Sequence, residues 1–325
     1  MNKIKVAVIG TGNMGIHHIR NYLNTPLVEF IAAVDRDEKR LQFISEKFAI
    51  PTYSSIDEII DQVDAVSIAT PTSSHYQIAA YCMNRGKHVL LEKPITLGIA
   101  EGEKLIALSK HNEVVFAVGH VERFNPVIHE LLNVLADQKP VYIDIHRESP
   151  FDPRIFDVDV VSDLMIHDID LLMYVLNENI KLKSAFGIRV HSDNCDIVNA
   201  QFISESGILL NVTTSRATEQ KVRQWRLILP KSLIEVDLAE RKLLIYRRTS
   251  VTIEMMNDRD VKYKQDQVIE KVVVPNYEPL QMEISDFLQS IIERKPPKVG
   301  GEEGLNALKL VIEIQRLIDQ QERES

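Results

Sequence analysis

Five short apolar runs, all rich in β-branched residues, recur within the first 120 residues and restrict the fold more than any other feature. The runs are Val6–Ile9, Val28–Val34, Ala65–Ala69, Val89–Leu91 and Val114–Val118. The amphipathic stretches between them are Met14–Leu23, Glu38–Phe48, Ser74–Asn84 and Ala100–His111. Nearly continuous apolar strands that alternate with helices are typical of a parallel sheet covered on both faces. The sequence therefore predicts a doubly wound α/β domain over residues 1–120.

The pattern changes after Gly119. A helical stretch, Pro126–Ala136, leads to the alternating run Val141–His146, and an amphipathic segment follows at Ser162–Leu176. Further segments with period two are Lys181–Val190, Val198–Ser204, Ile208–Ser215, Arg223–Leu229, Leu233–Asp237, Leu243–Arg247 and Val268–Val274, and two helical patterns, Leu280–Arg294 and Glu302–Arg323, close the chain. Strands that follow one another without helices indicate antiparallel pairing with one face exposed. Residues 121–325 are therefore predicted to form an α+β domain with a large, mostly antiparallel open sheet.

Composition excludes several classes of protein. The 325 residues are 45% hydrophobic and carry a net charge of −9, from 38 basic and 47 acidic side chains. This balance repels phosphate backbones and anionic lipids, so we expect no nucleic-acid or membrane partner. No apolar run approaches the roughly 20 residues that span a bilayer. Cys82 and Cys195 form no CxxC pattern, which excludes a disulfide framework and a cysteine zinc site and indicates a cytoplasmic protein.

The segment Gly10-Thr11-Gly12-Asn13-Met14-Gly15 places three glycines between a predicted strand and a predicted helix. In this arrangement the first glycine permits a tight turn, and the second lets the backbone approach a pyrophosphate. The third allows close packing of helix on strand, while the helix N-terminus faces the phosphate charge. The motif predicts a Rossmann dinucleotide site in which Gly10, Gly12, Asn13, Met14 and Gly15 bind the cofactor.

An acidic residue follows the second predicted strand. Asp35 lies about 20 residues after Gly15, where a carboxylate meets the ribose hydroxyls of the adenosine. Its charge disfavours a 2′-phosphate, so NAD is predicted in preference to NADP. Arg36 leaves an alternative open, because an arginine at this position can pair with a 2′-phosphate.

Two further strand ends carry candidate residues, since the carboxyl ends of parallel strands face the ligand crevice. Thr70, Pro71 and His75 follow the strand at Ala65–Ala69 and are predicted to line the cofactor. Glu92 and Lys93 end the next strand, at the nicotinamide side of the crevice. A lysine at this place can donate a hydrogen bond to a substrate hydroxyl.

In the second domain, Asp163, His167 and Asp170 have the i, i+4 and i+7 spacing of one helical face. A histidine with carboxylates one turn away can act as a general base near neutral pH. Metal binding competes with this interpretation, but no HExxH motif or second ligand cluster supports it. A capped helix with a structurally satisfied histidine is the other alternative.

Together these residues resemble the Gfo/Idh/MocA family of nicotinamide-dependent sugar and cyclitol oxidoreductases. The resemblance covers nearly the whole chain, and its specific elements are Glu92-Lys93-Pro94 and the D-x-x-x-H helix that begins at Asp163. It implies that Lys93 orients the substrate hydroxyl and that Asp163 and His167 complete the catalytic set. It also implies a homodimer or homotetramer formed through the C-terminal sheet.

Two longer strings resemble a narrower subset, the UDP-N-acetylglucosamine 3-dehydrogenases. They are Gly119–Pro126, with Arg123 and Asn125 as candidate substrate residues, and Asp163–Asp170. Met165 departs from the usual small residue two positions after the aspartate and predicts a reshaped substrate pocket. The resemblance implies oxidation of the sugar C3 hydroxyl to a 3-keto sugar. An inositol or free-sugar dehydrogenase and a non-catalytic NAD-binding regulator remain the alternatives.

Two arginines flank a turn that contains prolines. Arg147 and Arg154 precede Asp163, and guanidinium groups suit the oxygens of a diphosphate. They are therefore predicted to bind a sugar nucleotide. The alternative is that both pair with acidic neighbours, namely Glu148, Asp152 or Asp157.

Overall fold

The computed structural model describes residues 3–136, 138–152, 158–256 and 260–324. The chain divides into two compact units, which are treated separately below. Unit 1 comprises Met1–Phe124 with Tyr277–Leu310, and unit 2 comprises Asn125–Asn276 with Val311–Ser325.

Unit 1 contains a parallel sheet with the strand order β3-β2-β1-β4-β5-β6. The strands are β1 Ile4–Ile9, β2 Val28–Val34, β3 Thr52–Tyr53, β4 Ala65–Ile68, β5 His88–Glu92 and β6 Phe116–Gly119. The helices of this part are α1 Asn13–Leu23, α2 Glu38–Phe48, α3 His75–Met83 and α4 Ile99–His111. The order reverses between β1 and β4, and ligands of such sheets bind at the carboxyl ends of the strands beside this point. The prediction of a doubly wound Rossmann sheet is confirmed.

Helix α7, Pro279–Glu293, also belongs to unit 1. Its apolar face, which includes Ile284 and Phe287, shares a hydrophobic core with Val6 and Val8 of β1. The division drawn from the sequence placed everything after residue 120 in the second domain, whereas 277–310 pack with the first. An amphipathic pattern reveals a helix but does not reveal which sheet the helix covers. The sequence therefore did not show that the chain returns to unit 1 after the sheet of unit 2.

Unit 2 is built on a sheet with the strand order β14-β13-β12-β11-β7-β10-β9-β8. The strands are β7 Tyr142–Glu148, β8 Ile180–Ile188, β9 Ile197–Ser204, β10 Leu209–Ser215, β11 Val222–Ile228, β12 Ser232–Asp237, β13 Lys242–Met256 and β14 Asp260–Val272. Neighbouring strands are antiparallel except for the parallel pair β7 and β10. The predicted mostly antiparallel sheet is confirmed.

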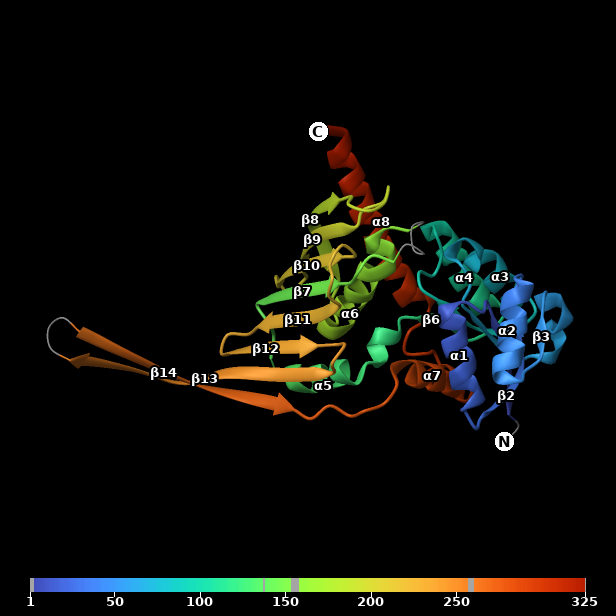
Figure 1. Ribbon diagram of the computed structural model, residues 1–325, viewed down its shortest axis with the longest axis horizontal. Coiled ribbons are helices and arrows are strands. Elements are labelled where there is room, and N and C mark those ends of the chain that lie inside the picture. Colours follow the sequence, from blue (N-terminus) through green and yellow to red (C-terminus); the bar gives the residue numbers. More distant parts are fainter. Residues whose placement is uncertain (1–2, 137, 153–157, 257–259, 325) are drawn as a thin grey trace. The chain divides into compact units, whose positions relative to one another are not determined.

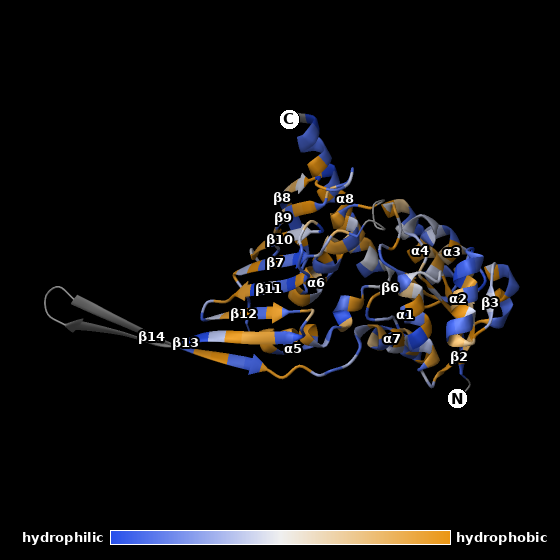
Figure 2. Ribbon diagram, in the orientation of Figure 1, coloured by the Kyte–Doolittle hydropathy of each residue, from blue (hydrophilic) through white to orange (hydrophobic). Residues whose placement is uncertain are grey.

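The two faces of this sheet differ. Along β7, Ile143, Ile145 and Arg147 are buried, and the residues between them are partly exposed. Hydrophobic and hydrophilic residues are interleaved along these strands (Figure 2). Helices α5, Pro126–Leu135, and α6, Ile166–Leu176, lie on the buried face (Figure 1). The last helix of the chain is α8, Gly301–Glu324, whose second half belongs to this unit.

Strands β13 and β14 are much longer than the short apolar runs predicted for them. They pair with each other from Leu243 with Val272 to Met256 with Asp260, whereas β12 pairs with β13 only as far as Arg247. The outer part of this hairpin therefore extends beyond β12 (Figure 1). Backbone pairing between two strands needs no buried face, so hydrophobic alternation did not reveal the extension.

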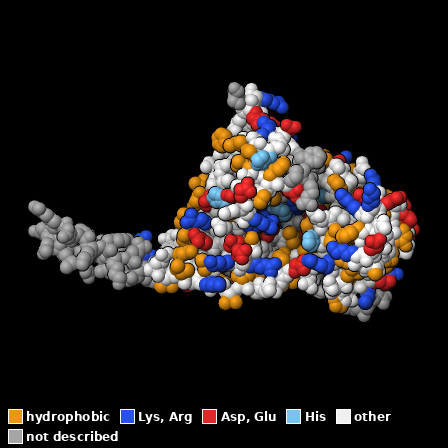
Figure 3. Space-filling model, in the orientation of Figure 1, with side chains coloured by type: hydrophobic (Ala, Val, Ile, Leu, Met, Phe, Trp, Pro, Cys, Tyr) orange, Lys and Arg blue, Asp and Glu red, His pale blue; other side chains and the backbone are white. Residues whose placement is uncertain are grey.

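Within the described residues, no helix combines the length and the apolar character needed to cross a bilayer. On the face of the molecule drawn in Figure 3, basic and acidic side chains are interspersed over the described surface.

Candidate active site

The glycine motif forms a cradle between β1 and α1. Gly10 has φ +91°, and a Cβ added there would lie 2.5 Å from the carbonyl oxygen of Ala69. A Cβ on Gly15 would lie 1.9 Å from the carbonyl oxygen of Gly10. At Gly12 the nearest described atom, in the Arg40 guanidinium, would be 4.0 Å away, so this backbone is open to a ligand. The turn thus provides the close backbone approach that a pyrophosphate requires.

A cavity of about 710 Å³ opens beside this turn, at the carboxyl ends of β1, β2, β4 and β5. Its lining includes nine of the predicted cofactor residues, Gly10, Gly12, Met14, Asp35, Arg36, Thr70, Pro71, Glu92 and Lys93. Arg40, Ser54 and Ser55, which the motif did not reveal, line it as well. Asn13 begins α1, and neither it nor Gly15 is among the lining residues.

The Asp35 carboxylate is held by the glycine turn itself. Its Oδ2 accepts hydrogen bonds of 2.7 Å from both the backbone N–H and the hydroxyl of Thr11, and Oδ1 accepts one of 3.0 Å from the N–H of Asp37. Partial burial raises the pKa of Asp35, but the bonds from Asp37 and Thr11 outweigh it, so this pKa lies below its ordinary value. The group is therefore a fixed anion. Both lone pairs of Oδ2 are taken by these bonds, and Oδ1 keeps one lone pair for a ribose hydroxyl.

Replacing Asp35 by alanine is expected to weaken NAD binding and to narrow the preference for NAD over NADP. A lost hydrogen bond to a charged acceptor costs on the order of 1.5–3 kcal/mol. The measurement is a calorimetric titration of wild type and variant with each dinucleotide. If wild type prefers NADP, then Arg36 and Arg40, which also line the cavity, govern this end of it and the assignment to Asp35 is wrong.

Lys93 follows β5 directly, and a buried pair lies beside it. The Nε2 of His18, on α1, is 2.9 Å from Oε1 of Glu92, and Oε2 accepts a hydrogen bond of 3.3 Å from the backbone N–H of Lys93. Burial raises the pKa of Glu92, but its hydrogen bond to His18 and the nearby charges of His18 and Lys93 outweigh it and lower this pKa. No sequence pattern pointed to His18, because a histidine within an amphipathic helix carries no motif of its own.

His75 does not line the cavity, although the sequence predicted that it would. It is 1% exposed and lies behind the lining, with both ring nitrogens next to backbone carbonyls.

In unit 2, the predicted catalytic segment begins as a short π-helix, Val161–Met165, and continues as α6. Single π-turns within α-helices are frequent at functional sites. Asp163 and His167 are half-buried, whereas Asp170 is 1% exposed. That all three share one helical face stays a prediction, because burial alone does not define the side of the helix on which a residue lies. The π-turn changes the spacing that an unbroken α-helix would give.

Helix α6 is fixed to the sheet by a buried ion pair that the sequence prediction missed. Asp168 accepts hydrogen bonds from Nε and Nη2 of Arg147, at 2.5 and 3.1 Å, and from Nε1 of Trp225, at 3.0 Å. Arg147 is 2% exposed, so it anchors the helix and does not face a diphosphate. Its role as a substrate residue is thereby corrected.

The remaining predicted substrate residues are placed as follows. The side-chain amide of Asn125 donates to the carbonyl of Leu238 at 3.1 Å, and its Oδ1 caps α5 by accepting from the N–H of Val127. Asn125 is therefore a buried structural cap. Arg123 is 7% exposed, and its carbonyl accepts a bond from Lys298. Arg154 lies outside the described residues.

Among the described residues, no three His, Cys, Asp or Glu side chains gather in a way that could hold a metal ion. The glycine cradle, the fixed carboxylate after β2 and the lysine in the same cavity define a dinucleotide-binding oxidoreductase of the Rossmann class.

Comparison with known proteins specifies this class. The family described as oxidoreductase family, NAD-binding Rossmann fold (Gfo/Idh/MocA) matches residues 4–120. UDP-N-acetylglucosamine 3-dehydrogenase of Acidithiobacillus ferrooxidans is 30% identical over 320 residues, which cover 98% of each chain. A solved structure of that enzyme superimposes with a TM-score of 0.88 at 29% identity, over 98% of this chain and 99% of the other. Myo-inositol 2-dehydrogenase of Thermotoga maritima is 25% identical over 94% of each chain. The chain belongs to the Gfo/Idh/MocA oxidoreductase family.

Proposed function

We propose that the protein is an NAD-dependent dehydrogenase that oxidises the C3 hydroxyl of UDP-N-acetylglucosamine to the 3-keto sugar. The observation that carries the reaction type is the presence of Lys93 in the cavity beside the glycine cradle. The full-length similarity to a UDP-N-acetylglucosamine 3-dehydrogenase supports the substrate.

The glycine cradle and Asp35 would hold NAD, and the open backbone at Gly12 fits its pyrophosphate. When bound, the nicotinamide supplies an acceptor for the hydride that leaves the sugar carbon. The residues of the chain handle the oxygen and its proton. His167 removes the hydroxyl proton as a general base, and Asp163 stabilises the charge that this histidine gains. Lys93 donates a hydrogen bond to the same oxygen and stabilises the negative charge that develops on it.

The substrate assignment is tested by comparing three alcohols with wild-type enzyme and NAD. We expect kcat/KM for UDP-N-acetylglucosamine to exceed that for N-acetylglucosamine by far, because the free sugar lacks the binding energy of the nucleotide. Equal activity on both sugars, or strong activity on myo-inositol only, would contradict the sugar-nucleotide assignment. The similarity to a myo-inositol 2-dehydrogenase makes an inositol dehydrogenase the second candidate. NAD binding without turnover of any alcohol would indicate a regulator.

We further propose a homodimer or homotetramer formed through the sheet of unit 2. Strand register places Phe186, Leu209 and Ile228 on the open face of this sheet, where they are 61%, 48% and 44% exposed. Exposed apolar residues on an otherwise polar face support an interface there. Sedimentation equilibrium of wild type and of a variant with Phe186→Glu measures whether the chain associates through this sheet.

A further inference from the structure

His75 lies between two loops of unit 1. It begins α3, and its buried ring is close to one backbone carbonyl of each loop. Nδ1 is 2.8 Å from the carbonyl oxygen of Pro94, and Nε2 is 2.9 Å from that of Thr70. Thr70 lies just after β4, and Pro94 lies just after β5. A single imidazole thus spans the ends of two neighbouring strands.

The two loops carry different parts of the cavity wall. Thr70 and Pro71 line it from the end of β4, and Glu92 and Lys93 line it from the end of β5. Both chain neighbours of Lys93 are held by a histidine. The carboxylate of Glu92 accepts a hydrogen bond from the backbone N–H of Lys93 and also contacts the ring of His18. The carbonyl of Pro94, the next residue, contacts the ring of His75. A displacement of the His75 ring would therefore move Pro94, the residue that directly follows Lys93.

The chemistry of the ring defines which substitutions test this arrangement. Burial lowers the pKa of His75, although the carbonyls of Pro94 and Thr70 and the charge of Glu92 oppose the shift. A neutral imidazole carries one N–H and donates to one carbonyl, whereas the protonated ring donates to both. The amide nitrogen of asparagine lies about where Nδ1 does and can donate to Pro94, whereas that of glutamine reaches about as far as Nε2 and can donate only to Thr70. Leucine keeps much of the apolar volume and has no donor.

We propose that His75 is a positioning residue, which ties the loop of Thr70 to the turn of Lys93 and so holds the dinucleotide and the lysine in one geometry. The proposal rests on the dehydrogenase function proposed above. Because a misplacement of about 1 Å can reduce a reaction rate by about 10²-fold, a ring that touches no substrate can still control turnover.

The test compares His75→Leu and His75→Asn with a control at the opposite end of β5. There His88 Nδ1 accepts a hydrogen bond of 2.9 Å from the N–H of Val115, so His88→Leu also removes a bond between a histidine and the backbone. Calorimetric NAD titration, the single-turnover rate of NADH formation and Tm are measured for each variant. We expect His75→Leu to weaken NAD binding about tenfold, the scale of one lost hydrogen bond, and to slow hydride transfer as well. His75→Asn, which keeps a donor toward Pro94, should restore most of both losses, and His88→Leu should lower Tm only.

The proposal is wrong if His75→Leu lowers Tm as His88→Leu does but keeps NAD affinity and rate within a factor of about two of wild type. If the leucine variant does not fold, His75→Gln, whose amide nitrogen reaches toward Thr70 and not toward Pro94, replaces it with the same criteria. If wild type oxidises no sugar, the proposed function fails, and NAD affinity still decides the role of His75.

Discussion

Replacing His167 by alanine is expected to lower the single-turnover rate of hydride transfer by roughly 10²–10⁴, the range that a general base contributes. Lys93→Ala is expected to fall in the same range, because it removes the donor to the reacting oxygen. NAD affinity should survive in the His167 variant, since the cavity that would hold the dinucleotide is lined by residues of unit 1. Rapid mixing with detection of NADH fluorescence measures the rate, and calorimetry measures the affinity.

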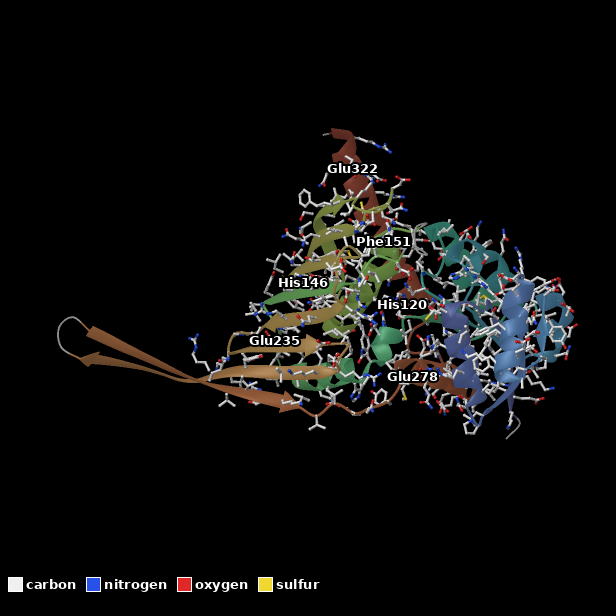
Figure 4. The ribbon with its side chains drawn as sticks, viewed as in Figure 1. His120, His146, Phe151, Glu235, Glu278 and Glu322 are labelled. Atoms are coloured by element: carbon white, nitrogen blue, oxygen red, sulfur yellow. The ribbon has the colours of Figure 1, made fainter. Side chains whose placement is uncertain are left out.

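His146 provides the control for this experiment. It lies on β7 in the same unit, and its partly exposed side chain is close to Asp144 and Glu148 on the open face of the sheet (Figure 4). His146→Ala should leave the rate of hydride transfer unchanged. A rate near that of wild type in His167→Ala would remove this residue as the base.

Replacing Asp168 by alanine is expected to lower the free energy of unfolding by about 3–5 kcal/mol, because it leaves the charge of Arg147 buried without its carboxylate. The indole N–H of Trp225 loses its acceptor in the same variant. Urea denaturation, followed by circular dichroism, measures the change. Since Asp168 is the neighbour of His167 along α6, hydride transfer in this variant should slow as well.

The matched control for Asp168 is an exposed pair on the same sheet. Glu235, labelled in Figure 4, belongs to β12. Its carboxylate lies 3.3 Å from Arg226, and the side chains of the pair are 37% and 54% exposed. Exposed ion pairs contribute about 1 kcal/mol or less, so Glu235→Ala should have a small effect. Equal losses in the two variants would show that the buried pair does not anchor α6.

The local pattern of the sequence predicted most elements of both units, apart from the extension of β13 and β14, because burial on a sheet or helix leaves a period that can be counted. The apolar run Val28–Val34 coincides with β2, and the helical pattern Glu38–Phe48 coincides with α2. What the pattern could not predict is pairing over long distances in the chain. Helix α7 is an example, because nothing within it specifies that its apolar face covers β1.

In the candidate site, too, the local patterns were predicted and the long-range contacts were not. The glycine motif, Asp35 and Lys93 lie where their positions relative to the strands predicted. Arg147 was misplaced although the signal was present, since it has the same strand parity as the buried Ile143 and Ile145. A charged residue at a buried parity requires a buried partner, and Asp168 is that partner. The contact of His75 with Pro94 joins residues from two strand ends, so no spacing rule could reveal it.

The most direct test of the proposed reaction is a single turnover with UDP-N-acetylglucosamine that carries deuterium at C3, with NAD and wild-type enzyme. Mass spectrometry of the dinucleotide then shows where the hydride came from. We predict that the NADH formed carries the deuterium and that the sugar becomes the 3-keto product. NADH without deuterium, or an unchanged sugar nucleotide in the presence of bound NAD, would contradict the proposed reaction.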